Sequence, residues 1–437
     1  MTTKITEQNI SNLANLGVQW QAVVTASTLN AAVGKGYFID TTSNACTITI
    51  TASGSATAGD TIVFKDYARN WGTNAITFAS NKFDGVDSRT PSFSTTGQTV
   101  TLVHMGSTKG WSLINEDTTT GLGETFIAAT GGTITTSGNF KIHSFTGDSN
   151  FVVSQAPGGG APGVDYLVVA GAGGGGGDGG GGGGAGGFRM SNSTCMPAPL
   201  TSPLASPSGL AVTAQTYPIT VGGGGTAGRY SPAPSTVGGD GSNSVFSTIT
   251  SAGGGGGGAG AGAGGNDGRN GGSGGGSTRP GSTGGSGNTP PVSPPQGNNG
   301  SSAGPSPNGN GGGGAGVAGQ ANPGPSQGGR GGDGSYASTC IAVGCAGVPH
   351  TDIPASNPPS VSGAKYFAGG GGGGGDGSPA PGNYGGLGGG GIGGDRPSGS
   401  NAGTGQANTG GGGGGAGVPG NAGAGGKGIV IIRYKFQ

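Results

Sequence analysis

The residues that usually carry catalysis or bind metals are few in this chain and lie far apart. No CxxC or HxxxH spacing indicates a zinc site, no acid/base pair stands out, and no serine, histidine and aspartate come with a nucleophile elbow. The residues concerned are the histidines His104, His143 and His350, the glutamates Glu7, Glu116 and Glu124, and the cysteines Cys46, Cys195, Cys340 and Cys345. We therefore expect a protein that is not an enzyme and that holds no metal and no cofactor.

Two of these residue sets have simple structural interpretations. His143 alternates with Ile142 and Phe145 in a β-type run, which is typical of a structural strand histidine. For Cys340 and Cys345 two interpretations stay open, a small loop closed by a disulfide or two free thiols, and synthesis in a cytoplasm favours the thiols.

Aromatic residues beside Arg or Lys recur in the segments between the glycine runs, and such residues contact proteins and sugars. The alternative is that they pin these loops against the glycine scaffold. The four segments are Phe188–Ser208, Thr226–Val237, Ser277–Asn310 and Ser335–Phe367. The candidate receptor-binding residues in them are Phe188, Arg189, Arg229, Tyr230, Tyr336, His350, Lys365, Tyr366 and Phe367.

The scaffold that must position these loops is the stretch Pro157–Lys427, which holds most of the chain's 114 glycines. Glycine is a poor helix or strand former, and the other residues are gathered into patches, unlike a flexible Gly/Ser linker. The left-handed helix with three residues per turn has no internal hydrogen bonds, so neighbouring glycine rods can bond backbone to backbone. The sequence thus predicts a bundle of polyglycine II helices, in which a run such as Gly171–Gly187 would reach roughly 50 Å at ~3.1 Å per residue.

Two other glycine-rich architectures fit less well. A collagen triple helix needs a sustained Gly-X-Y register, which is absent. A calcium-binding nonapeptide roll has one imperfect copy, Gly238–Phe246, so we interpret Asp240 as a turn residue.

The chain before the glycine region indicates short strands. Residues 1 to about 20 have a loosely helical spacing of apolar residues, which predicts a short helix. From there to Asp117 we expect a small all-β domain in which Trp71 and Trp111 are core aromatics rather than a sugar platform. The expected strands are Gly36–Asp40, Cys46–Thr51, Thr61–Asp66, Asn74–Phe78, Gln98–His104 and Gly110–Ile114.

Apolar runs on both sides of the glycine region predict a β-sandwich into which the glycine rods are inserted. Asn139–Thr146 and Asn150–Ser154 flank a Gly-Asp turn and are expected to form a hairpin. Asp165–Ala170 and Gly428–Phe436 bracket the glycine region, and we expect them to pair. Leu210–Val221 and Val245–Thr250 are expected to add one strand each.

Two stretches resemble parts of appendage proteins of tailed bacteriophages. GKGYFIDTTSNACTITI, AGDTIVFKDYARNWGTNAITF and TVTLVHMGSTKGWSLINED are similar to a β-module of tail-fibre proteins, over nearly all of residues 22–117. TGGTITTSGNFKIHSFTGDSNFVVSQ, DYLVVAGAGGGGG, GSNSVFSTITSAGGGGGG and GKGIVIIRY resemble the glycine-rich domain of such proteins, over 125–437. This domain is more distantly similar to polyglycine-helix adhesins at phage fibre tips and to the glycine-rich domain of the anaplastic lymphoma kinase receptor family.

The resemblance implies a mainly β fold in three parts. Residues 1–21 would attach or oligomerise the chain, 22–117 would form the phage-fibre β-module, and 118–437 a jelly-roll-like sandwich carrying the polyglycine II insertion at about 171–427. The sandwich strands would fall in 125–170, 210–221 and 428–436.

The implied function is that of a tail or head fibre that displays loops for recognition of a host-surface protein or glycan. A homotrimer joined to other virion proteins through its N-terminus is expected, assembled in the host cytoplasm and exposed on the particle. The alternative is a spacer or filament without a receptor. Ice or crystal binding is a third hypothesis, and an esterase or glycan lyase is disfavoured by the missing acid/base pairs.

Charge and hydropathy exclude some other partners. Lys plus Arg and Asp plus Glu number 18 each, which leaves no electrostatic attraction for nucleic acid or anionic membranes. No basic-plus-apolar leader and no apolar run near the ~20 residues of a membrane span is present, so no membrane insertion is expected.

Overall fold

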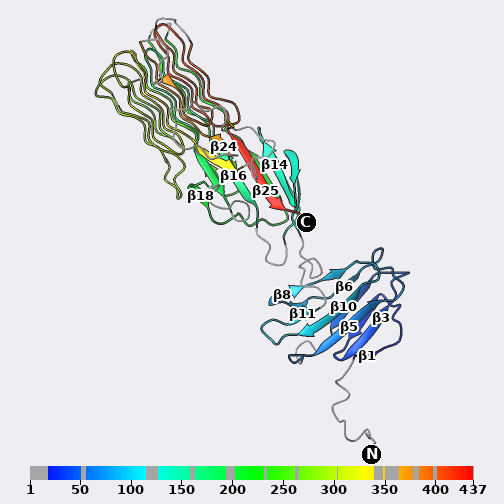
Figure 1. The fold of residues 1–437 in the computed structure, drawn as a ribbon. Coiled ribbons are helices and arrows are strands. Elements are labelled where there is room, and N and C mark those ends of the chain that lie inside the picture. The colour runs from blue at the N-terminus through cyan, green and yellow to red at the C-terminus, as the bar shows by residue number, and fades with distance from the viewer. Residues whose placement is uncertain are drawn as a thin grey trace, which may run out of the picture. The chain divides into compact units, whose positions relative to one another are not determined.

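The chain divides into two compact units, Met1–Phe126 with Pro157–Ala161, and Ile127–Ala156 with Pro162–Gln437. The computed structural model describes residues 18–50, 56–114, 126–157, 163–192, 202–230, 234–260, 265–302, 304–338, 348–349, 364–376, 383–396 and 401–436. Their regular structure is all β, as the sequence predicts, and no helix occurs among these residues (Figure 1). The helix expected near the N-terminus falls on residues outside these ranges, apart from its last few.

The first unit contains a seven-stranded and a four-stranded sheet. The seven strands, in spatial order, are β1 (Gln19–Trp20), β3 (Lys35–Ile39), β5 (Thr61–Asp66), β10 (Thr99–His104), β11 (Trp111–Leu113), β7 (Asn81–Phe83) and β8 (Val86–Arg89). The four are β2 (Thr28–Ala31), β4 (Cys46–Ile50), β6 (Ile76–Phe78) and β9 (Ser92–Phe93). The strands expected from alternating residues are therefore all present, within two residues of their expected bounds.

One apolar core fills the space between these two sheets. In β4 the pattern of buried and exposed residues alternates strictly, as the run Thr47-Ile48-Thr49-Ile50 requires of a strand with one buried face. Trp71 and Trp111 are 0% and 1% exposed and belong to this core, which confirms that they are packing residues.

The second unit is built on a sandwich of a six-stranded and a five-stranded sheet. The six strands are β13 (Thr133–Ser137), β14 (Phe140–Phe145), β25 (Ile429–Lys435), β16 (Asp165–Val169), β17 (Phe188–Ser191) and β18 (Ala205–Ser206). The five are β12 (Ala128–Thr130), β15 (Ser149–Gln155), β19 (Thr216–Thr220), β20 (Ser244–Phe246) and β21 (Ile249–Ser251). The predicted pairing of the two runs that bracket the glycine region is confirmed, because β16 pairs antiparallel with β25.

The central strands β16 and β25 of the six-stranded sheet are buried on both faces, which explains their continuous apolar runs. Along β25, Val430 and Ile432 pack into the core between the two sheets, whereas Ile429 and Ile431 pack into a core on the opposite face. That second core also receives Phe367 from a small third sheet. The third sheet consists of β22 (Ser335–Ser338), β24 (Ala364–Phe367) and β23 (Val348–Pro349).

The hairpin expected over residues 139–154 is wrong. β14 pairs with β13 and β25, whereas β15 pairs with β12 and β19, so the two strands lie in opposite sheets of the sandwich. The Gly147-Asp148 turn therefore crosses between sheets, and the Asp148 carboxylate fixes it by accepting a 2.8 Å hydrogen bond from the Val221 amide. Both strands still point aromatic side chains, Phe145 and Phe151, into the shared core, which is why their patterns look like those of paired strands.

Two further expected strands are shorter than the sequence suggests. Val245–Thr250 is a tight hairpin of β20 and β21, because Ser247 adopts a left-handed conformation (φ 52°) that interrupts the run. In Leu210–Val221 only β19 is a strand, and Leu210 makes an isolated bridge to Val164.

A buried ion pair sets the register between β16 and β25. Asp165 and Arg433 are direct register partners, and Asp165 Oδ2 lies 3.8 Å from Arg433 Nη1. Ser191 donates a 3.0 Å hydrogen bond to the same carboxylate, and the guanidinium lies 3.5 Å from the ring centroid of Phe140. Burial lowers the pKa of Arg433 to about 10, although Asp165 opposes this shift. A slip of one residue would separate the two charges inside the protein, which is costly.

His143 is a buried structural residue of β14, as expected. Its Nδ1 lies 2.7 Å from the Gly131 carbonyl, which can only accept, so Nδ1 carries the proton and Nε2 accepts from the Tyr434 hydroxyl at 3.1 Å. Burial lowers the pKa of His143 below its ordinary 6.5.

This shift makes the stability of the second unit dependent on pH. Because the folded-state pKa of His143 lies below the unfolded value of 6.5, the unfolded chain binds more protons, and stability falls as pH drops from about 6.5 through the folded pKa. We expect His143→Gln to flatten this part of the profile in denaturant titrations between about pH 7 and 5. An unchanged slope in the variant would assign the effect to another group.

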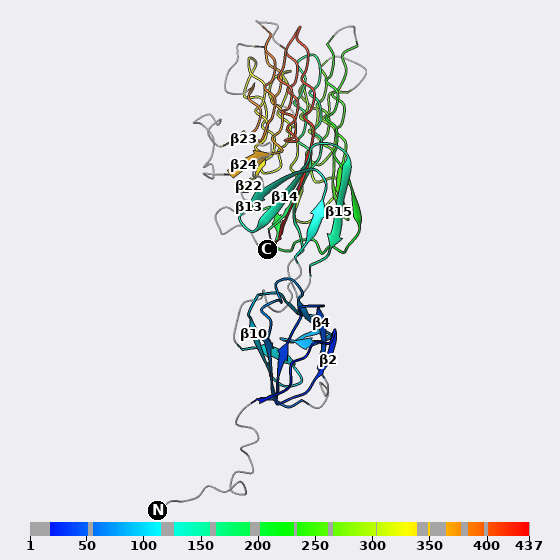
Figure 2. The same ribbon diagram turned by 90° about the vertical axis from the view of Figure 1, so that its right-hand side faces the viewer.

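Beyond one end of the sandwich the glycine segments run side by side, out from the strands and back (Figures 1 and 2). β16 continues directly into 170–177, the chain turns at Asp178 and Gly179, and 180–187 leads back to β17. The outward segments are 170–177, 221–230, 252–260, 273–278, 296–302, 317–322, 368–375, 390–395 and 410–416. The return segments are 180–187, 234–243, 265–272, 282–289, 309–315, 328–334, 383–388, 401–406 and 421–428.

Backbone hydrogen bonds join these segments with a period of three residues. In 170–177, every third amide donates to the same neighbour, and the three sets of amides serve three neighbours. Gly171, Gly174 and Gly177 donate to Ser242, Gly239 and Thr236 of segment 234–243. Ala172 and Gly175 donate to Gly426 and Gly423 of segment 421–428. Gly173 and Gly176 donate to Gly184 and Gly181 of segment 180–187, and all these N···O distances are 2.9–3.0 Å. Three residues per turn is the period of the polyproline II type of helix.

The carbonyls of the same segment accept from three other neighbours, again with a period of three. The donors are Gly254, Gly257 and Gly260 from one segment, Gly225 and Gly228 from a second, and Gly413 and Ala416 from a third. This segment therefore has six hydrogen-bonded neighbours, and we call the whole array (the outward and return segments) the glycine lattice. Its cohesion comes from backbone hydrogen bonds, whereas the two sheets of the sandwich are held against each other by packed side chains.

Candidate functional site

The lattice has two sets of turns, one beside the sandwich and one at its far end. We call the described far-end residues the outer turns: 178–179, 278–281, 304–308, 323–327, Asp376, Arg396 and 417–420. They are far apart in the sequence and gather because outward and return segments have similar lengths. Since function concentrates on loops held by rigid elements, these turns are the candidate site.

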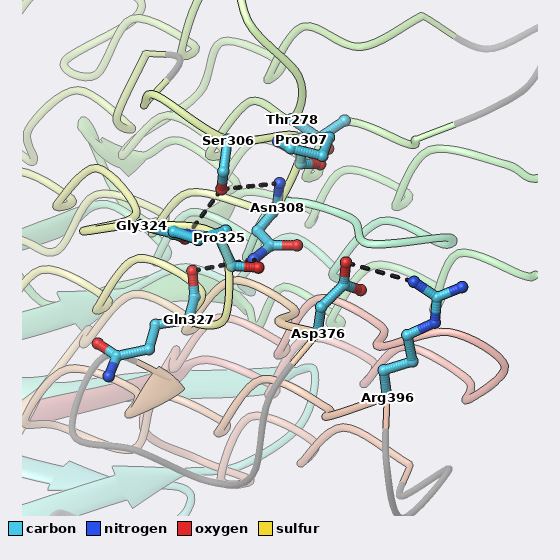
Figure 3. Close-up of polar contacts among 9 residues, drawn as sticks. All are labelled: Thr278, Ser306, Pro307, Asn308, Gly324, Pro325, Gln327, Asp376 and Arg396. Atoms are coloured by element: carbon cyan, nitrogen blue, oxygen red, sulfur yellow. Dashed lines mark hydrogen bonds and ion pairs between the residues drawn. The ribbon is translucent and has the colours of Figure 1, made fainter.

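Buried hydroxyl and amide groups hold neighbouring outer turns together (Figure 3). Thr278 donates from Oγ1 to the Gly179 carbonyl at 2.8 Å and to the Pro307 carbonyl at 3.2 Å. Ser306 donates from Oγ to the Gly324 carbonyl at 2.9 Å. Each contact joins two turns that are separated in sequence, so the turns 178–179, 278–281, 304–308 and 323–327 form one connected surface.

Asn308 and Asn322 extend this network. Asn308 donates from Nδ2 to the Pro325 carbonyl at 2.9 Å (Figure 3). Asn322, 1% exposed, donates from Nδ2 to the Asn308 carbonyl at 2.9 Å. Its Oδ1 lies 2.9 Å from Ser306 Oγ and shares the single hydroxyl proton with the Gly324 carbonyl. Its amide thus ties the turn 304–308 to the start of the turn 323–327.

We expect Asn322→Ala to loosen the outer turns without unfolding the lattice. It leaves the Ser306 hydroxyl and the Asn308 carbonyl without this buried partner, which costs roughly 1–3 kcal/mol. Hydrogen exchange should accelerate in 304–308 and 323–327 and stay unchanged in 170–187. The exposed neighbour Ser326→Ala serves as control and should change neither; equal effects of both variants would contradict this role.

Ion pairs and prolines complete the surface of the outer turns. Arg396 Nη1 lies 3.4 Å from Asp376 Oδ2, and Arg279 Nη2 lies 4.0 Å from Asp178 Oδ2. The arginine side chains are 60% and 43% exposed, so they remain accessible to a partner. The exposed prolines of the turns are Pro280, Pro305, Pro307, Pro323, Pro325 and Pro419.

Asparagine and aspartate side chains cap the edge of the lattice, where a segment lacks a neighbour on one side. Asp267, Asn270 and Asn299 each accept a hydrogen bond through Oδ1 from the edge segment 282–289. The amides are those of Thr283, Ser286 and Gly287, at 2.6, 2.7 and 2.9 Å. Asp240 acts similarly, accepting from Gly256 at 2.9 Å and pairing with Arg269 at 2.7 Å. It therefore lies in a return segment and not in the turn that we expected.

The candidate residues from the sequence do not form one site. Arg229 and Tyr230 lie at the outer end of an outward segment, where the Arg229 amide donates to Thr236 Oγ1 at 2.9 Å. Phe188 and Arg189 lie in β17, a strand of the six-stranded sheet of the sandwich, and Phe188 is 1% exposed. Their expected place in a loop is wrong, because both are strand residues and Phe188 packs into the core on the opposite face of the six-stranded sheet.

The third group of candidates lies in the small third sheet. Tyr336 is in β22, and Lys365, Tyr366 and Phe367 are in β24. Tyr366 and Phe367 are 6% and 0% exposed, and the Tyr336 and Tyr366 rings lie 5.7 Å apart, so these rings pack within the fold and are not loop residues. His350 lies outside the described residues.

The expected loop Ser277–Asn310 contains lattice segments. Residues 282–289 and 296–302 belong to the lattice, and only 278–281 and 304–308 are outer turns. Sequence reasoning missed Ser306, Asn308 and Asn322 as organising residues. The recurrence of Asn, Ser and Pro between glycine runs was the available signal.

The described residues also bear on metal and membrane binding. Within those ranges no three His, Cys, Asp or Glu side chains are grouped so that they could hold a metal ion. No helix in the same ranges is long and apolar enough to cross a bilayer.

Comparison with known proteins agrees with the architecture of the second unit. A search of curated proteins finds no match to the chain. A family model described as a glycine-rich domain matches residues 153–435, from within β15 to the last residue of β25. The match covers more than half of the chain and spans the whole lattice with its closing strand, so the protein belongs to the glycine-rich domain family.

Proposed function

We propose that this protein is a virion appendage of a tailed bacteriophage, a tail or head fibre, whose outer turns contact the host surface. On this proposal the glycine segments are polyglycine II helices that act as a stiff support. The period of three and the six neighbours of segment 170–177 favour that conformation. The resemblance of residues 22–117 and 125–437 to phage appendage proteins favours the setting.

The observation that carries the proposal is the gathering of the outer turns at one end of a lattice, tied by buried polar contacts. A preorganised surface loses less conformational entropy when it binds. Exposed arginines and prolines there offer contacts to a protein or glycan, whereas a plain spacer would need only glycine turns. The partners proposed with this function are virion proteins at the N-terminus and further copies of the chain in a homotrimer.

The test exchanges outer turns in the intact particle. Residues 304–308 and 323–327 would be replaced by short Gly/Asn turns, and adsorption to host cells measured. We expect adsorption to fall at least about tenfold, as for loss of a binding hot spot. Replacing the sandwich-side turn Pro290–Pro295 is the control and should leave adsorption unchanged. Unchanged adsorption with both exchanges would favour the interpretation as a spacer. In a second experiment, an antibody against this protein that never labels virions would contradict the proposal.

A further inference from the structure

The first unit carries an exposed aromatic platform on the outer face of its seven-stranded sheet. Trp20 in β1 and Phe38 in β3 are stacked, with ring centroids 4.4 Å apart and an interplanar angle of 19°. Tyr67 follows at 6.3 Å from Phe38. Trp20 and Tyr67 are 47% and 56% exposed, although large aromatic side chains are usually buried.

The backbone beneath the platform is shaped for the Trp20 ring. Trp20 and Gly36 are register partners in the parallel pair β1 and β3. A Cβ on Gly36 would lie 2.7 Å from Trp20 Cε3, so glycine is what allows the ring to lie flat on the strand and reach Phe38. The ring therefore has a fixed position with one face on the sheet.

The surroundings of the platform are polar. Lys65 is the register partner of Phe38, and its Nζ donates to the Gly97 carbonyl at 2.5 Å. Farther along the same face lie Thr99, Thr101 and Ser112. The apolar surface here consists of the three rings and Val63, the register partner of Gly36, which is only 9% exposed. A stable protein interface, by contrast, buries about 800 Å² on each partner with an apolar centre.

We propose that this platform binds a sugar ring of a neutral oligosaccharide. A pyranose has one face of C–H groups and a rim of hydroxyls, which matches the exposed Trp20 ring with the Tyr67 ring inclined beside it, at 66° to Phe38, and polar groups around them. This site is distinct from the outer turns, since it lies in the other unit, and it stands whether or not the outer turns bind a host.

Tryptophan fluorescence of the full chain tests the proposal directly. Trp71 and Trp111 are buried, so Trp20 is the tryptophan that a soluble ligand can reach. We would titrate cellohexaose, maltohexaose and chitohexaose to about 10 mM, because single weak contacts correspond to millimolar dissociation constants. At least one sugar should give a saturable change.

Variants decide whether the change arises from the platform. Tyr67→Ala should weaken binding about tenfold or more, and Trp20→Ala should abolish it in calorimetric titration. Tyr384→Ala, an exposed tyrosine of the other unit at 44%, is the control and should bind normally. Absence of saturation with all three sugars, or binding that survives Trp20→Ala, would overturn the proposal. A fall in oligomeric mass on Trp20→Ala would also overturn it, by assigning the platform to contacts between copies.

Discussion

Gly182→Ala should strongly destabilise the second unit. A Cβ at this position would lie 2.0 Å from the Gly371 carbonyl oxygen and 2.5 Å from its carbon. The obstacle is backbone, and it cannot move aside, because the Gly371 amide donates to Gly183 and its carbonyl accepts from Gly312. Adding atoms to a well-packed core costs about 1–3 kcal/mol, and here the neighbouring segment would have to give up hydrogen bonds as well.

We therefore expect a loss of at least about 4–5 kcal/mol, a large part of the total stability of an ordinary domain. Calorimetry and hydrogen exchange of the lattice amides would measure it. Gly223→Ala is the matched control, since a Cβ there meets nothing within 4 Å. It should leave stability unchanged or raise it by up to about 1 kcal/mol by restricting the unfolded chain. Similar melting of both variants would contradict a lattice held by close backbone contact.

Ile431→Asp should have a comparably large effect. Ile431 is fully buried in β25, the strand that lies between β14 and β16, so its side chain is surrounded in the sheet and packed from one face. A carboxylate there loses its hydration without a partner, which costs several kcal/mol in addition to the lost apolar contacts. We expect destabilisation of about 5 kcal/mol or more.

The same substitution at an edge provides the control. Ile134 lies in the edge strand β13 and is 46% exposed, so Ile134→Asp keeps its charge in water and should cost within about 1 kcal/mol. Denaturant titration of both variants compares them. If Ile134→Asp were as harmful as Ile431→Asp, the central position of the last strand would not explain the effect.

The strands and the lattice were predictable from local patterns. Alternation in Cys46–Ile50 identified β4, and the continuous apolar runs of β16 and β25 identified strands buried on both faces. The glycine runs predicted hydrogen bonding between rods because glycine alone permits such close approach. In each case one short stretch of sequence is enough to identify the element.

Pairing partners and the ends of segments were not predictable in the same way. β14 and β15 have the pattern of a hairpin, yet the choice between pairing and crossing to the other sheet depends on β25, which lies almost 300 residues later. Likewise, the sequence around Phe188 does not show on which side of the lattice the segment ends. That depends on the number of preceding turns, so the local sequence does not distinguish the buried strand residues of β17 from loop residues.

The period of three has a consequence for how such a gene can change. One extra glycine within a segment would rotate every following residue by a third of a turn, so that each amide would face a different neighbour. Insertions of three residues restore the orientation, and insertions in a turn leave it untouched. We therefore expect natural length variants of this protein to differ by multiples of three residues within the lattice segments, and by any number of residues in the turns.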